Sequence, residues 1–512
     1  MVQSPRAFTS ATHYLSFFLL LVLAIQNVVW LVCGIFAVLF PYGLDFGEGV
    51  LANQARLLGL GRTIYGPIDQ PPWLVSNYPP VMMALAALLH RLVPPLTELA
   101  AGRVLAMLGT IGIVAVLVRL ARLNRHSPWW ALMPPWLWLV AVPAFRWGQV
   151  FRVDTLGIAF ALWGLFCLTF AKPRWRILGM ALLIAAVFTK QSLMAAPLAW
   201  LICHDGSPEA KRERALFVAA GLLVFGGLEF ATGGGLLRHT VFYTANTFHI
   251  ARLMAGLSEY LAMVLPLLLL VGWQLARLRE PMWRHLRGRT WLVYGMLSSL
   301  TLITFGATGS DSNYYLEPLA ALLAIIAICP AGLLEPDPDV SLGPLTLSSN
   351  ALGGLLVAAF MGISIWGQSG TYMAVPNDQW TAETRDQQLM EQLRQVPGPV
   401  LSEDFSFTLA AGKEPDFQPY IFRLLAEKGK WDETRFVQRL TDGYYDRIVL
   451  HANLFQPGNS EEPGSDPLGA GYDRLTPAME DAIRAHYALV PPESQWFDGQ
   501  WYLYAPKEHP TR

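Results

Sequence analysis

The sequence predicts a polytopic α-helical membrane protein, with about eleven transmembrane helices and an α/β domain at its C-terminal end. Of its 512 residues, 53% are hydrophobic and only 15% are charged, whereas about 25% of the residues of an average soluble protein are charged. Apolar segments recur along residues 1–370, and the composition turns polar from about Thr371. We therefore expect a transmembrane domain over 1–370 and a soluble domain over 371–512.

The first apolar segment, residues 14–40, contains no formal charge. It is far longer than the hydrophobic region of a signal peptide, which spans roughly 7–15 residues. It is long enough to cross a bilayer with some tilt. We therefore predict that it is the first transmembrane helix and not a cleaved signal.

Further apolar segments follow at 79–95, 100–119, 128–145, 153–171, 174–189, 191–203, 214–232, 258–276, 290–307, 314–333 and 350–367. Basic residues concentrate in four loops, at 119–126, 172–176, 211–214 and 277–289. The positive-inside rule places such loops in the cytoplasm. All four share one side only if 79–95, which opens with Tyr78-Pro79-Pro80, is an interfacial or re-entrant helix. Eleven spans result, with the N-terminus inside and the C-terminal domain extracytoplasmic, as in a multi-pass protein of the plasma (inner) membrane.

The C-terminal region has the pattern of a small α/β layer domain. Short apolar runs predict strands at 400–401, 447–450 and 501–504, and helical periodicity is found at 379–396, 420–428 and 477–487. The stretch 456–471 is rich in glycine and proline and is predicted to be a loop.

Composition also excludes several classes of site. The net charge is -1 and no domain is basic, so nucleic acid is not an expected partner. Packing roles are predicted for the four cysteines, which lie in separate apolar runs: Cys33, Cys167, Cys203 and Cys329. His239 and His249 are predicted to be ordinary hydrogen-bonded histidines. No metal-ligand set stands out, so no cofactor is expected and a divalent metal is not indicated.

The predicted topology brings four polar stretches to the outer side: 41–98, 146–154, 233–257 and 308–313. The loop 41–98 opens with Asp45 and Glu48, which would share one face of a helix. One carboxylate could deprotonate a hydroxyl nucleophile while the other orients it. Alternatively, they are solvated acids at the membrane edge, or an N-cap of a helix over 50–59.

Other ionisable residues flank the later spans. Arg146, Arg152 and Asp154 precede the fourth span, where such groups are costly unless paired or functional, and an interfacial Arg–Asp pair is the structural alternative. Lys190 lies between two short apolar segments and either snorkels to the interface or binds an anion at a helix break. Glu317 would lie one turn inside the membrane, where it needs a partner or a water-filled cavity.

Carboxylates, cations and amides from separate segments thus fall at one depth on one face. This arrangement suits a reaction with an anionic phosphate leaving group and a nucleophile that must lose a proton. A solute transporter would instead place ionisable residues near the bilayer midplane and show internal pseudo-symmetry, and neither feature is evident in the sequence.

The order of these motifs resembles the GT-C superfamily of polyprenyl-phosphate-dependent glycosyltransferases, in particular family 39-like members related to protein mannosyltransferases and aminoarabinose transferases. The matching pieces, which cover about residues 10–320, are Asp45-Phe46-Gly47-Glu48, Tyr78-Pro79-Pro80, Arg152-Val153-Asp154, Thr189-Lys190 and Asn313-Tyr314-Tyr315-Leu316-Glu317-Pro318. The family often has adjacent Asp-Glu in the first loop, whereas Asp45 and Glu48 are separated. Aminoarabinose transferases have Lys-Pro-Pro where this chain has Tyr78-Pro79-Pro80.

The resemblance implies a membrane glycosyltransferase that moves a sugar from a polyprenyl-phosphate donor to a lipid, glycan or protein acceptor, with inversion, at the outer face. Asp45 or Glu48 would be the base, and which of them it is stays open. Arg152 and Lys190 would neutralise the leaving lipid phosphate, and Asp154 would orient Arg152 or the acceptor. The remaining residues of the expected substrate site are Tyr78, Arg146, Asn313, Tyr315 and Glu317. The alternative is a lipid-linked glycan flippase or cell-envelope assembly factor that uses the same cavity without catalysis.

Overall fold

The computed structural model describes residues 5–124, 132–244, 246–276, 278, 282–329, 340–342, 345–347, 349–368, 387–451, 453–455, 474–490, 495–496 and 501–507. The predicted loop 456–471, the start of the predicted helix 379–396 and the predicted domain boundary at 370/371 lie outside these residues.

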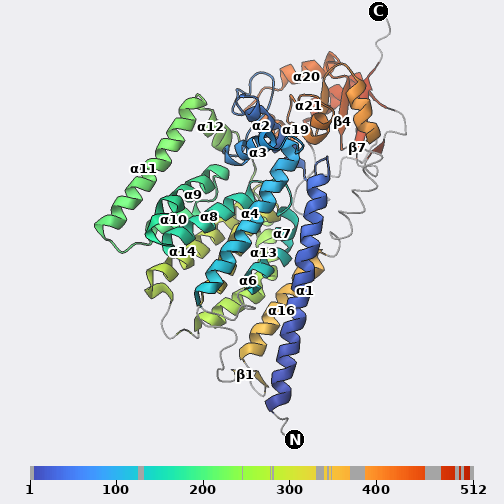
Figure 1. Cartoon of the computed structure of the whole chain (residues 1–512). Helices are drawn as coiled ribbons and strands as arrows, with labels where there is room; N and C mark the ends of the chain where they lie inside the picture. Colours follow the sequence, from blue (N-terminus) through green and yellow to red (C-terminus); the bar gives the residue numbers. More distant parts are fainter. Residues whose placement is uncertain are drawn as a thin grey trace, which may run out of the picture.

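Long apolar helices dominate the N-terminal two thirds of the described chain (Figure 1). Within the described residues, four helices are long and apolar enough to cross a membrane: α1 (Pro5–Leu39, over Phe17–Leu39), α4 (Glu98–Ala121), α11 (Pro208–Ala231) and α13 (Ile250–Ala276). Helix α1 corresponds to the predicted first span. The described fold is therefore that of a mostly helical integral membrane protein.

Several other predicted spans are shorter or broken. The helices in them are α6 (Met133–Val140), α7 (Val142–Trp147), α8 (Asp154–Thr169), α9 (Arg176–Thr189), α10 (Ala195–Ile202), α14 (Leu286–Leu300), α15 (Leu316–Ile328) and α16 (Ser349–Gln368). The break between α6 and α7 falls at Ala141, whose backbone is extended. Pro143 explains it, because proline has no N–H to continue the ladder of a preceding helix.

Short elements connect these helices. They are α2 (Phe46–Gly59), α3 (Val81–Leu92), η1 (Arg122–Asn124), η2 (Pro173–Trp175), α12 (Gly235–Leu237), η3 (Arg238–Phe242), η4 (Met282–Arg284), η5 (Thr301–Gly306), η6 (Ser312–Tyr315), β1 (Val340–Leu342) and β2 (Leu345–Leu347). Helix α15 is buried along its whole length and contacts α4, α6, α8, α13 and α14. The start of α15 is therefore held rigidly at one end of the bundle.

The C-terminal region contains a small sheet with the order β3 (Val400–Ser402), β4 (Arg447–Leu450), β7 (Trp501–Pro506) and β5 (Tyr487–Leu489). Strands β3 and β4 are parallel, β7 is antiparallel to β4 and β5, and β6 (Gln495–Trp496) pairs with β7. Its helices are α18 (Phe405–Ala410), α19 (Pro419–Glu427), α20 (Thr434–Thr441) and α21 (Pro477–His486). The sequence missed β5 and β6, which are only three and two residues long.

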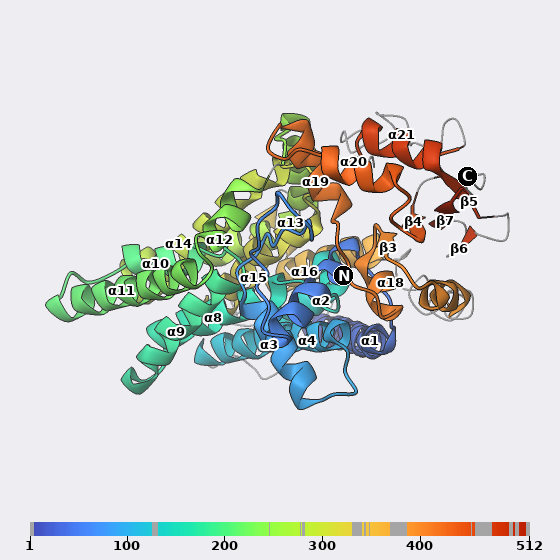
Figure 2. The ribbon, with the colours of Figure 1, turned by 90° about the horizontal axis from the view of Figure 1, so that it is seen from above.

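The C-terminal region and the first long loop share one core. Trp73 from the loop is buried against Phe417, Trp431 and Phe436. The backbone N–H of Trp73 donates to the Asp416 carbonyl at 2.7 Å. Seen from above, the loop between α2 and α3 passes beside α19 and α20 (Figure 2). The C-terminal region therefore fixes the loop from which part of the site is built.

Candidate active site

Asp45 and Arg152 form one half of a charged cluster at the end of the helical bundle. Asp45 is the N-cap of α2, and its Oδ2 accepts the Gly47 N–H at 2.9 Å. Nη1 of Arg152 donates to the same Oδ2 at 3.1 Å. A side chain at Gly47 would place its Cβ 2.0 Å from that Nη1. The glycine in Asp45-Phe46-Gly47-Glu48 is therefore required for the close approach of Arg152.

Asp154, Lys190 and Asn313 form the other half. Asp154 is the first residue of α8, and Lys190 is the extended residue directly after α9, so the predicted helix break is present. Nζ of Lys190 donates to Oδ1 of Asp154 at 2.6 Å, and Nδ2 of Asn313 lies 3.3 Å from both Asp154 oxygens. All three side chains are buried. Neighbouring helix ends thus supply a cation, an anion and an amide at one point.

Two tyrosines connect the halves. Nζ of Lys190 lies 4.7 Å from the centre of the Tyr314 ring, a cation–π geometry. Tyr78 and Tyr314 both lie near Lys190 and near Arg152. The predicted residues Asp45, Tyr78, Arg152, Asp154, Lys190 and Asn313 therefore lie in one cluster, together with Tyr314.

Two expectations need correction. The anticipated Arg152–Asp154 pair is replaced by Arg152–Asp45 and Lys190–Asp154, because the chain folds so that each cation meets a carboxylate from another segment. Tyr315, predicted to contact substrate, points away from the cluster, and its hydroxyl donates to the Gly256 carbonyl at 2.9 Å. Consecutive residues of η6 point in different directions, so Tyr314 takes the predicted place of Tyr315.

Arg146 lies at the edge of the cluster. Its guanidinium is 3.5 Å from Asp311 and stacks on the Trp147 ring at 4.7 Å. The Arg152 guanidinium lies 5.5 Å from the centre of the same ring. Because the side chain of Arg146 is about half exposed (52%), it borders the site and is not locked into it.

Glu317 and its neighbours carry unpaired polar atoms. In the described part of the chain, Oε1 of Glu317, Oδ1 of Asn313 and Nε of Arg152 are buried without a hydrogen-bond partner. The same holds for Oδ1 of Asn77 and Oε1 of Gln191. Buried polar groups are usually bonded, and leaving one unpaired costs about 1–3 kcal/mol. The concentration of such atoms around Lys190 and Arg152 marks a place that a polar ligand or water would complete.

Glu48 has a different environment from Asp45. It is fully buried, and its two oxygens accept bonds from Arg103 at 2.9 and 2.6 Å. They also accept the backbone N–H of Leu44 at 2.7 Å and of Phe151 at 2.6 Å. A carboxylate has about four lone-pair sites, so Glu48 has no free acceptor for a substrate proton.

Arg103 was not predicted from the sequence to have a role. It lies near the start of the apolar run 100–119 and is fully buried. Besides Glu48, it donates to the carbonyls of Ala37, Phe40 and Tyr42 at 2.5–2.6 Å. An arginine inside an otherwise apolar span is a signal in itself, because it requires a buried partner.

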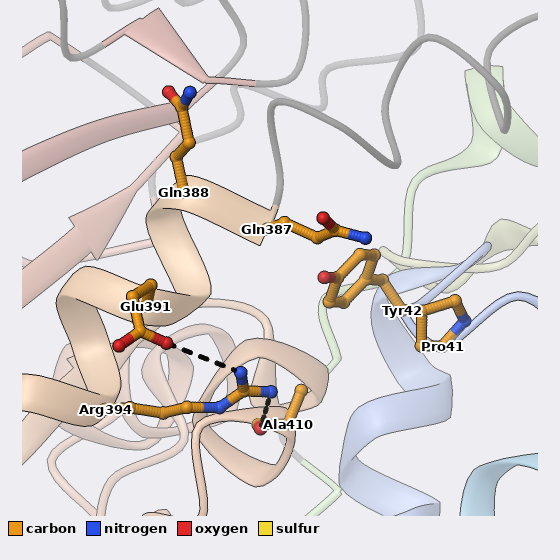
Figure 3. Close-up of a pocket in the computed structure, with 7 residues that line it drawn as sticks. All are labelled: Pro41, Tyr42, Gln387, Gln388, Glu391, Arg394 and Ala410. Carbon is orange, nitrogen blue, oxygen red and sulfur yellow. Dashed lines mark hydrogen bonds and ion pairs between the residues drawn. The ribbon is translucent and has the colours of Figure 1, made fainter.

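A separate hollow of about 620 Å³ lies beside the end of α1, lined by Pro41, Tyr42, Gln387, Gln388, Glu391, Arg394 and Ala410. Figure 3 shows Arg394 turned toward Glu391 and the Ala410 carbonyl. None of the predicted site residues lines this hollow. Within the described residues, no group of three or more His, Cys, Asp or Glu side chains is placed to hold a metal ion.

Comparison with known proteins identifies the fold. No known protein-family profile and no curated protein sequence matches the chain. Among solved structures, ArnT from Cupriavidus metallidurans in the apo state matches with a TM-score of 0.58 and 14% identity, over 97% of this chain and 98% of that chain. ArnT bound to undecaprenyl phosphate matches with a TM-score of 0.56 and 13% identity, over 96% and 98%.

An oligosaccharyltransferase from Archaeoglobus fulgidus, tethered with an acceptor peptide, matches with a TM-score of 0.45 and 11% identity, over 94% of this chain and 74% of that chain. The match to ArnT covers both chains almost completely, so the protein has the GT-C fold.

Proposed function

We propose that this protein is a glycosyltransferase that moves a sugar from a polyprenyl-phosphate donor to an acceptor at the outer face of the membrane. The observation that carries the proposal is the placement of a half-buried carboxylate, Asp45, against a cation cluster beside which several polar atoms have no partner among the described residues. The fold is shared with ArnT, one of whose structures contains undecaprenyl phosphate.

In this proposal Asp45 is the base. In the described structure both hydrogen bonds of its carboxylate go to Oδ2, which leaves Oδ1 to accept the proton of an acceptor hydroxyl. The deprotonated oxygen attacks the anomeric carbon of the sugar, and the bond between that carbon and the phosphate oxygen breaks. Glu48, the other candidate base predicted from the sequence, instead has a structural role and bonds the surrounding chain.

Arg152 and Lys190 are proposed to receive the lipid phosphate. Charge-assisted hydrogen bonds from both would stabilise the negative charge that develops on the leaving group. Lys190 is held by Asp154, whose carboxylate also accepts from Asn313, so Lys190 is oriented before the donor arrives. Tyr78 and Tyr314 would add phenolic donors, while Arg146 and Glu317 border the same space.

The position of Asp45 also bears on the non-catalytic alternative. A carboxylate beside a bound phosphate weakens binding by repulsion, so a flippase or assembly factor gains nothing from it. A base must be close to the reacting centre, so catalysis requires such a carboxylate. The enzyme is therefore favoured over the flippase.

The test is an assay of the purified full-length protein with a panel of radiolabelled polyprenyl-phosphate sugars and a membrane lipid extract as acceptor. We expect one donor to lose its sugar with release of polyprenyl phosphate, and we expect Asp45→Asn to stop the release. If the protein moves a lipid-linked sugar between leaflets and cleaves none, the non-catalytic alternative holds.

We further propose eleven spans, an N-terminus in the cytoplasm and a boundary near 370 between the membrane domain and an extracytoplasmic α/β domain. The start of α1 and the C-terminal sheet lie at opposite ends of the molecule (Figure 1), as an odd number of spans requires. Cysteines introduced at 62 and 460 should react with an impermeant reagent in intact cells, and those at 210 and 286 should not. Labelling at 210 from outside would overturn this topology.

A further inference from the structure

The segment that delivers Tyr78 to the cluster has no helix or strand to hold it. Side chains from elsewhere instead bond three consecutive residues of its backbone. The Ser76 N–H donates to Nδ1 of His239 at 3.1 Å. The carbonyl of Asn77 accepts from Gln191 at 2.8 Å, and that of Tyr78 accepts from the Tyr65 hydroxyl at 2.8 Å.

His239 is suited to be a fixed acceptor. It lies in η3 and is 1% exposed. The rings of Tyr65 and Tyr243 form T-shaped contacts with the imidazole, with centroid–centroid distances of 5.6 and 5.0 Å. Because a backbone N–H can only donate, Nδ1 must be unprotonated, and the ring proton sits on Nε2, 2.7 Å from the Gly66 carbonyl. One imidazole thus bonds two points of the loop between α2 and α3, at Gly66 and at Ser76.

Gln191 connects this loop to the charged cluster that contains Lys190. It directly follows Lys190, and its Nε2 donates to the carbonyls of Asn77 and Thr240, at 2.8 and 3.3 Å. Thr240 is the neighbour of His239. The segments that carry Lys190, Tyr78 and His239 are therefore joined at one amide.

From this geometry we propose that His239 and Gln191 are positioning residues that set the Tyr78 hydroxyl against Lys190 and Arg152. The inference rests on the proposed function, in which these three side chains receive a polyprenyl monophosphate. Without the two side chains, the 76–78 segment would have to be ordered when the phosphate binds, and that ordering lowers affinity. Neither residue touches the reacting atoms.

Two substitutions at one position separate positioning from packing. Asparagine carries an acceptor oxygen on Cγ, where histidine has Nδ1, so His239→Asn keeps the bond to Ser76. Glutamine carries its amide nitrogen where histidine has Nε2, so His239→Gln keeps the bond to Gly66 and loses the one to Ser76. We expect affinity for undecaprenyl phosphate, measured in nanodiscs, to fall about tenfold in His239→Gln and less than threefold in His239→Asn. Equal losses in the two variants would overturn the proposal.

A double-mutant cycle identifies the residue through which His239 acts. Tyr78→Phe removes the phenolic donor and should weaken undecaprenyl phosphate binding about tenfold. If His239 acts by placing that hydroxyl, His239→Gln should add less than a threefold loss in the Tyr78→Phe background. Independent effects would instead multiply, and a combined loss of about a hundredfold would refute the assignment. Gln191→Glu, which turns a donor toward two carbonyls into an acceptor, should behave in the cycle as His239→Gln does.

Amide hydrogen exchange tests the positioning without any donor. In the full-length protein, His239→Gln should lose protection at Ser76, whereas Trp73, bonded to Asp416, should keep it. If protection at Ser76 is unchanged, the positioning proposal fails whatever the protein binds. If protection is lost as expected but the parent binds no undecaprenyl phosphate, the positioning role stands and the proposed donor is wrong.

Discussion

Two buried carboxylate–cation pairs lie in different regions of this molecule and have opposite environments. Glu48 and Arg103, where α1, α2 and α4 meet, have a partner for every carboxylate oxygen site. Asp154 and Lys190, where α8 begins and α9 ends, lie beside atoms of Asn313 and Glu317 that have no partner in the described chain. Both pairs are charged and buried, so neither charge nor burial distinguishes a structural pair from a functional one. We propose that the degree of hydrogen-bond saturation does.

The physical reason lies in desolvation. A buried ion pair is stable only when its geometry is good and its remaining donors and acceptors are bonded. Glu48 meets that condition inside the protein. The Asp154–Lys190 pair is short, but its surroundings retain unpaired donors and acceptors, and a ligand can satisfy them.

The largest effect is expected at Asp45. Asp45→Asn keeps the shape and can still cap α2, but it removes the proposed base. Transfer should fall by about 10²–10⁴-fold, while the melting temperature stays near that of the parent. The measurement is the rate of polyprenyl phosphate release, with circular dichroism as the folding control. Full activity in this variant would remove Asp45 from the mechanism.

Glu48→Gln should act on stability. Removing one partner of a buried ion pair strands the other charge, at a cost of about 3–5 kcal/mol, and Arg103 would be the stranded residue. We expect a lower midpoint of denaturant unfolding, with residual transfer by the protein that remains folded. A variant that is as stable as the parent but inactive would show that Glu48, and not Asp45, is the base.

Lys190→Met should weaken phosphate binding about tenfold or more. Because Asp154 is buried beside Lys190, the single change also strands a carboxylate, so stability should fall as well. The matched control is Lys190→Met with Asp154→Asn, which removes both charges. Stability should recover in the double variant and affinity for undecaprenyl phosphate should not. Recovery of both would make this pair as structural as Glu48–Arg103.

The smallest effect is expected where the C-terminal region meets α2. Burial, aided by the nearby Glu48 carboxylate, raises the pKa of Asp404 from 3.8 to about 6, although bonds from Ser406 oppose the shift. A raised carboxyl pKa means that stability increases as the pH falls from about 6 to 3.8. Asp404→Asn, which can still accept the Ser406 N–H, should therefore be more stable than the parent at pH 8, on the order of 1 kcal/mol. The difference should vanish by about pH 4 in thermal unfolding. An advantage that does not change with pH would contradict this account.

The helical segments and most of the charged residues of the candidate site could be predicted from the sequence. Apolar runs such as 14–40 form spans because their own composition favours the bilayer interior. Ionisable residues at the ends of such runs, among them Arg152, Asp154 and Lys190, are informative because a charge there is costly without a partner. These signals are local, and they could be read without coordinates.

Which residues pair could not be predicted from the sequence and depends on the packing of the helices. Glu48 meets Arg103 across 55 positions, Arg152 meets Asp45 across 107, and Asn313 meets Asp154 across 159. At such separations, distances depend on how the helices pack, and that packing is set by the whole core. The same packing turned Tyr314 toward Lys190 and Tyr315 away, gave every Glu48 oxygen its partners, and placed Asp45 beside the cations with one oxygen that no described residue bonds.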